Sequence, residues 1–161
     1  MHTAVPQVVT LEEFVWGIAL VATTMAVHGL GVVVTLNVGS RLHQGASGLP
    51  GRLLRLSRLV TATWMLVIVH LFEVTFIWGA FFWWQDAFAS TRDAVYYALM
   101  QYTTVGSALS LPERLRILGG MVAMAGLLTF AWSTSVLLVL AQDFQREYLK
   151  GGQGGASAKE R

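Results

Sequence analysis

The fold is decided by Tyr96-Tyr97-Ala98-Leu99-Met100-Gln101-Tyr102-Thr103-Thr104-Val105-Gly106-Ser107-Ala108. A short amphipathic helix is predicted to begin at Ser90 and to end at the Thr-Thr-Val-Gly turn, and a long apolar helix is expected only after Pro112. Non-helical backbone at membrane depth is tolerated only where protein buries it or where water fills a cavity beside it. Because the flanking segments are apolar, this stretch predicts a re-entrant pore loop that lines a cavity.

The composition favours a membrane protein. The chain has 161 residues, of which 55% are hydrophobic and 12% are charged, and a soluble domain of this size cannot bury so many apolar side chains. The net charge of +2 is too small to predict a nucleic-acid partner. The absence of cysteine excludes disulfides and thiolate chemistry. We therefore expect the lipid bilayer as a partner, and we expect no enzymatic activity.

Three apolar segments are long enough to cross a bilayer, which needs about 20 residues. The predicted fold class is an all-α membrane protein with three transmembrane helices and a re-entrant pore helix and filter loop between the second and third. The predicted divisions are an extracytoplasmic N-terminus (1–13), a first transmembrane helix (14–36), a basic cytoplasmic loop (37–58), a pore domain (59–143) and a disordered cytoplasmic tail (144–161). The loop holds four arginines and no acid, which predicts that it faces the cytoplasm. The N-terminus is then outside and the C-terminus inside.

The segment Thr103-Thr104-Val105-Gly106 resembles the first part of the selectivity filter of tetrameric potassium channels. Residues 125–137 are similar to the inner helix of that family, with Gly126 at the place of its hinge glycine, and the resemblance covers about residues 70–142. The resemblance implies a location in the bacterial inner membrane. It also implies a homotetramer, because the chain shows no internal repeat and the symmetry around a pore must come from four copies. It also implies that backbone carbonyls bind a monovalent cation such as potassium. The implied filter residues are Thr103, Thr104, Val105, Gly106, Ser107 and Ala108.

The chain departs from this family at Ser107-Ala108-Leu109, where the family has Tyr-Gly-Asp. An alanine at positive φ costs about 1 kcal/mol or more, and the tyrosine that braces the filter is missing. We therefore predict that the outer half of the filter is widened, rearranged or closed. The expected function is a monovalent cation channel with altered selectivity. The alternative is a non-conducting structural or accessory subunit of a larger membrane complex, with other membrane subunits as partners.

Three ionisable side chains fall inside the predicted spans: His28 in the first, and His70 and Glu73 on one face of the second. Such groups cost about 3 kcal/mol on insertion scales and are functional candidates. One interpretation is structural, with Glu73 tying the second span to the pore helix or to Thr and His side chains of a neighbour. The others are a metal site, a proton-sensitive switch or a pair of haem ligands. We expect no metal or other cofactor here, and keep a metal- or haem-binding protein as a second alternative function.

Overall fold

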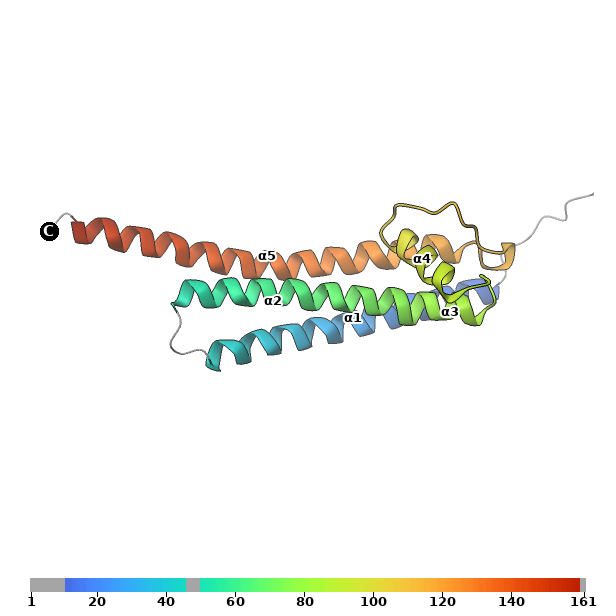
Figure 1. The fold of residues 1–161 in the computed structure, drawn as a ribbon, viewed down its shortest axis with the longest axis horizontal. Coiled ribbons are helices and arrows are strands. Elements are labelled where there is room, and N and C mark those ends of the chain that lie inside the picture. Colours follow the sequence, from blue (N-terminus) through green and yellow to red (C-terminus); the bar gives the residue numbers. More distant parts are fainter. Residues whose placement is uncertain (1–10, 46–49, 160–161) are drawn as a thin grey trace, which may run out of the picture. The chain divides into compact units, whose positions relative to one another are not determined.

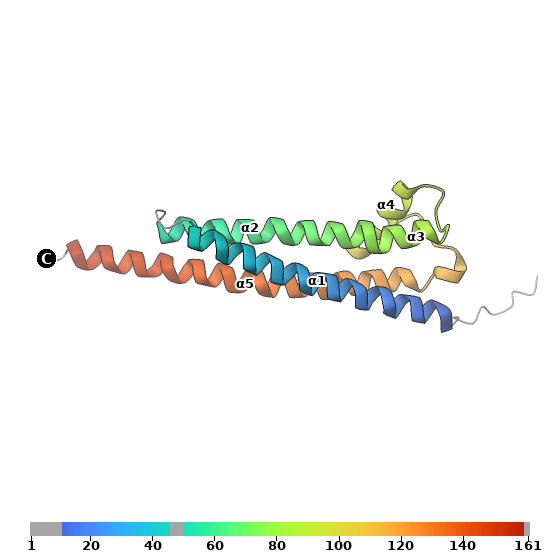
Figure 2. The same ribbon diagram turned by 90° about the horizontal axis from the view of Figure 1, so that it is seen from below.

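The computed structural model describes residues 11–45 and 50–159, and within them every regular element is helical. The elements are α1 (Leu11–Gly45), α2 (Gly51–Phe72), the π-helix η1 (Glu73–Gly79), α3 (Ala80–Trp84), α4 (Thr91–Tyr102), the 3₁₀-helix η2 (Glu113–Leu115) and α5 (Leu118–Lys159) (Figures 1 and 2). The second long helix therefore passes from α2 through η1 into α3 without a break.

Three stretches are long and apolar enough to cross a membrane: Leu11–Arg41, Gly51–Trp84 and Glu113–Arg146. This result confirms the predicted all-helical class with three helices of membrane-spanning length. It is compatible with an integral membrane protein. The short helix α4 lies between the second and third of these stretches in the sequence.

The long helices extend further than the sequence predicts. α1 continues to Gly45 and α2 begins at Gly51, so most of the expected 37–58 loop is helical. α5 continues to Lys159, although the composition predicts a disordered tail from residue 144. Extending an existing helix adds one hydrogen bond per residue without a new nucleation cost, and glycines near its end are therefore tolerated. Most of the predicted 1–13 segment lies outside the described residues.

The chain divides into two compact units, to each of which all three long helices contribute residues. The first unit combines the described residues up to Val27 with Leu71–Thr129, and the second combines His28–His70 with the residues from Phe130 onward. The core of the first unit is rich in aromatic side chains and consists of Val74, Trp78, Phe81, Phe82, Ala94, Tyr97, Ala98, Tyr102, Leu111, Leu115, Leu118, Val122 and Ala125. This core holds α4 and the loop that follows it.

Helix α4 is fixed at its start by a side-chain cap. The Ser90 hydroxyl accepts a hydrogen bond of 3.1 Å from the Asp93 backbone N–H, which satisfies one of the free donors of the first turn. α4 packs against η1 and α3, and a Cβ at Gly79 would come within 2.7 Å of Val95 Cγ2. Figure 1 shows α4 and its following loop beside the first part of α5. The start of the predicted pore helix therefore agrees with the sequence.

Candidate functional site

Helix α4 ends in a Schellman motif at the predicted filter segment. The N–H of Thr104 donates to the Gln101 carbonyl at 2.8 Å, and the N–H of Val105 donates to the Met100 carbonyl at 3.0 Å. Thr104 has the left-handed backbone that this motif requires, with φ of 61°. Glycine usually occupies this position, because a β-branched side chain is strained at positive φ. Strain of this kind concentrates at functional sites, which makes the segment a candidate for one.

The residues after Thr104 differ from one another in backbone conformation. Gly106 has φ of 82°, and a Cβ added there would meet no heavy atom within 4 Å, so its backbone conformation rather than crowding calls for glycine. Among the described residues other than glycine, only Asp86 and Thr104 have positive φ, so Ala108 does not carry the cost of a left-handed alanine. The strained residue of the segment is Thr104, because the Schellman motif places the left-handed position directly after the helix.

The filter-like segment, residues 103–108, is little covered by the rest of its own chain. The Val105 side chain is 70% exposed, and Thr103, Thr104 and Ala108 are also exposed. The Thr103 hydroxyl donates to the Leu99 carbonyl at 2.9 Å and so remains close to α4. An apolar side chain as open as Val105 is available to lipid, to water or to a second polypeptide.

Tyr102, the residue directly before this segment, is held from two sides. Its hydroxyl donates to a carboxylate oxygen of Glu73 at 2.5 Å and lies 2.6 Å from the Thr129 hydroxyl. Its carbonyl oxygen would lie 2.0 Å from a Cβ at Gly126. Tyr102 is 1% exposed, so its side chain and its main chain are both fixed. Gly126 thus permits close approach between α4 and α5, and its predicted role as a hinge stays a prediction.

The hydroxyl proton of Tyr102 can be assigned in this network. A phenol has one proton, and Tyr102 gives it to Glu73. Thr129 Oγ1 lies 2.6 Å from the Tyr102 oxygen and 3.0 Å from the carbonyl oxygens of Ala125 and Gly126, so these three acceptors compete for its single proton. Burial, and after it the hydrogen bond to Glu73, raises the pKa of Tyr102, so the phenol remains a donor. A buried polar network satisfied in this way is rigid. The sequence flagged Glu73 alone; Tyr102 and Thr129 gave no separate signal.

In the second unit, a serine lies between the two predicted histidines. His28 Nε2 and His70 Nε2 are each 3.1 Å from Ser133 Oγ, and the two rings are 4.9 Å apart by their centroids. The serine has one proton and can donate to only one ring, so the other ring must donate from its own Nε2. Within the second unit the structure therefore brings His28 and His70 together. Sequence analysis missed Ser133.

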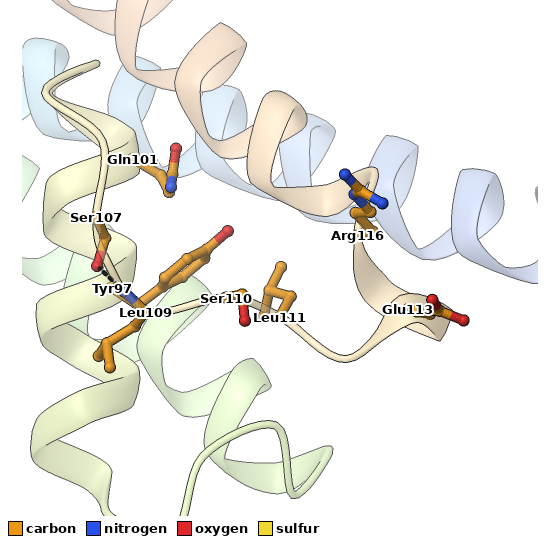
Figure 3. A pocket seen from close by; sticks show the side chains of 8 residues that line it. All are labelled: Tyr97, Gln101, Ser107, Leu109, Ser110, Leu111, Glu113 and Arg116. Atoms are coloured by element: carbon orange, nitrogen blue, oxygen red, sulfur yellow. Dashed lines mark hydrogen bonds between the residues drawn. The ribbon is translucent and has the colours of Figure 1, made fainter.

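A cavity of about 540 Å³ lies beside the filter-like segment in the first unit (Figure 3). Its lining comes from α4, from the loop and from the residues that lead into α5, namely Tyr97, Gln101, Ser107, Leu109, Ser110, Leu111, Glu113 and Arg116. Of these, only Ser107 was a predicted site residue. The others were missed because their spacing forms no recognisable motif.

No family model matches the chain, and neither the curated proteins nor the solved structures compared with it contain a significant match. The resemblance to potassium channels therefore depends on the residues of this chain alone.

Proposed function

We propose that this protein is the subunit of a homotetrameric, potassium-channel-like channel for monovalent cations, located in the bacterial inner membrane. In this proposal α4 is a re-entrant pore helix, residues 103–108 form a filter of altered selectivity, and the inner helix is α5. The observation that carries the proposal is the backbone from Thr103 to Gly106, which leaves helical form between two apolar stretches.

The carbonyl groups of this backbone support an ion-binding role. Among the described residues, no backbone N–H donates to the carbonyls of Thr103, Thr104, Val105 or Gly106. Carbonyls without such partners can replace the hydration shell of a cation, whereas unsatisfied carbonyls facing lipid would cost several kcal/mol each. One chain supplies only one such strand of carbonyls. Four copies around a common axis would complete the site.

Ion flux from purified protein in liposomes tests this proposal. Gly106→Asp places a charged side chain at a residue with φ of 82°, and we expect it to reduce potassium flux at least tenfold. Gly120→Ala is the matched control, because a Cβ there meets no heavy atom within 4 Å and it leaves flux unchanged. If the wild-type protein passes no monovalent ion at any voltage or pH, conduction is the wrong function.

The accessory-subunit hypothesis is favoured by the loop after Gly106. The Ser107 hydroxyl accepts a hydrogen bond of 3.0 Å from the Leu109 N–H, so this loop folds upon itself where a potassium channel has its bracing tyrosine. Stoichiometry in native membranes separates the two hypotheses. One copy beside foreign subunits supports the accessory role, and a symmetric tetramer of this chain contradicts it.

The metal or haem hypothesis is motivated by the proximity of His28 and His70. Ser133 Oγ is within hydrogen-bonding distance of both Nε2 atoms. A haem iron bound by both histidines would have to occupy the same place, so the position of Ser133 disfavours haem. Metal analysis and an absorbance spectrum test the hypothesis. A folded preparation that is colourless and free of metal would exclude both.

A further inference from the structure

The cavity beside the filter-like segment has the size of a ligand site. Its volume of about 540 Å³ falls within the range of about 300–1,000 Å³ that small-molecule pockets occupy. On the loop side it is bordered by the small side chains of Ser107 and Ser110, which leave space unfilled. The core of the same unit is closely packed, with Trp78 and Phe82 fully buried. The cavity is therefore a local feature of the loop and not a sign of loose packing throughout.

Two opposite charges line this cavity without pairing. Glu113 and Arg116 both contribute to its wall, and neither forms an ion pair with any residue that the structure describes. Figure 3 shows the carboxylate and the guanidinium turned away from each other. Arg114, which lies between them, instead donates to the side chain and the backbone carbonyl of Gln85. The cavity thus offers one cation and one anion at separate places.

The remaining polar groups are neutral donors and acceptors. Tyr97 is 5% exposed, and its hydroxyl would lie 2.6 Å from a Cβ at Gly119, so it is fixed at the cavity wall. Burial raises the pKa of Tyr97, and a hydrogen bond with Gln101 opposes this effect. Ser107 accepts from a backbone N–H and keeps its own proton to donate. Hydroxyl and amide donors beside a guanidinium suit an oxyanion.

We propose that this cavity binds a zwitterion of the phosphoethanolamine type, with its oxyanion at Arg116 and its primary ammonium at Glu113. Glu113 begins the third apolar stretch, so the cavity lies where an apolar span meets water. The zwitterion can therefore come from a phospholipid headgroup or from free solute. Because Ser107 and Leu109 belong to the loop, the ligand would also brace the filter-like segment and change ion flux. This regulatory part alone depends on the proposed channel function.

Binding is tested with the full chain in nanodiscs of phosphatidylcholine, whose quaternary ammonium has no N–H to donate to Glu113. The probes are phosphatidylethanolamine introduced into the nanodiscs and, separately, soluble phosphoethanolamine. We expect one of them to raise the melting temperature by about 3 °C or more. A shift with the lipid alone identifies the headgroup, and a shift with the solute alone identifies the free molecule. Each of these outcomes supports the site.

Three variants make the test specific, each compared with its own baseline stability. Glu113→Gln and Arg116→Gln should lose at least half of the shift. Arg114→Gln should keep all of it, because that side chain bonds to Gln85 and does not line the cavity. Three results would overturn the proposal. The first is that neither probe shifts the melting temperature. The others are a shift in Glu113→Gln equal to that of the wild type, or an equal shift with phosphatidylglycerol, which has no ammonium. If a probe shifts the melting temperature without changing the ion flux, the result supports the binding site and contradicts the regulatory role.

Discussion

At the scale of single residues, the backbone of α4 approaches α5 closely at Gly126. A methyl group there would lie 2.0 Å from the Tyr102 carbonyl oxygen and 2.9 Å from its carbonyl carbon. A backbone atom cannot rotate away as a side chain can, so α4 must shift. We expect Gly126→Ala to destabilise the protein by about 1–3 kcal/mol, the usual cost of overpacking. The measurement is unfolding in detergent, followed by tryptophan fluorescence.

Gly120→Ala is the control for this prediction, since it lies on the same helix and its added methyl group meets no heavy atom within 4 Å. There the gain in helix propensity of up to about 1 kcal/mol is the only expected effect. If the two variants lose the same stability, the close approach at Gly126 is not the cause.

Tyr102 contributes through one hydroxyl group that serves two buried partners. Tyr102→Phe keeps the ring and removes that hydroxyl, which leaves Glu73 without the donor that lies 2.5 Å away. A buried polar group that loses its partner costs about 1–3 kcal/mol. We expect a loss of unfolding free energy in this range. Tyr96→Phe is the matched control on the same helix, because Tyr96 is 48% exposed. A Tyr102→Phe protein as stable as the control would show that the network adds nothing.

At the scale of elements, the end of α4 combines a favourable hydrogen-bond pattern with an unfavourable residue. The Schellman motif needs a left-handed residue, and Thr104 fills it with φ of 61°. Thr104→Gly should therefore stabilise the protein by about 1 kcal/mol. Thr103→Gly should destabilise it, because Thr103 has φ of −82° and gains nothing from glycine. Chemical denaturation of the two variants checks the opposite signs. If Thr104→Gly is also less stable, the threonine side chain contributes more than its strain costs.

The elements also show how far the sequence alone leads. The three apolar stretches, the capped start of α4 and its end near Thr103 were predictable, because periodicity, capping residues and turn signals are local properties. The contacts of Tyr102 with Glu73 and Thr129 join residues 29 and 27 positions apart. Local patterns contain no information on such pairs. The same reason explains why Ser133 was missed between two histidines that were noticed.

The strain at Thr104 was missed for a different reason. The comparison with the filter pattern of another family directed attention to Ala108, where a rearranged outer half was predicted. The position of the left-handed residue is set instead by where α4 ends, which depends on the hydrogen bonds to the Met100 and Gln101 carbonyls. A helix terminus is therefore a better guide to backbone strain here than the alignment of a four-residue motif.

At the scale of the whole molecule, the exposed filter-like segment predicts an assembly. In a single chain Val105 is 70% exposed, beside carbonyls that have no backbone partner among the described residues. Four copies of the chain around an axis would cover the Val105 side chain and these carbonyl groups. The chain has no cysteine, so Val105→Cys introduces a single thiol. We expect a membrane-impermeant maleimide to label it at least tenfold more slowly in the assembled protein than after dissociation in harsh detergent.

Ala89→Cys is the control for this labelling, because Ala89 is exposed and lies before α4, outside the filter-like segment and the cavity, where assembly should leave its rate unchanged. The assembled species should have four times the 17.6 kDa mass of the chain, measured by native mass spectrometry on the same sample. Fast labelling of both thiols in intact membranes would mean that no partner covers Val105. A tetramer in which Val105 still reacts quickly would place the shared axis elsewhere, and the carbonyls of the segment would then lose their role in binding a cation.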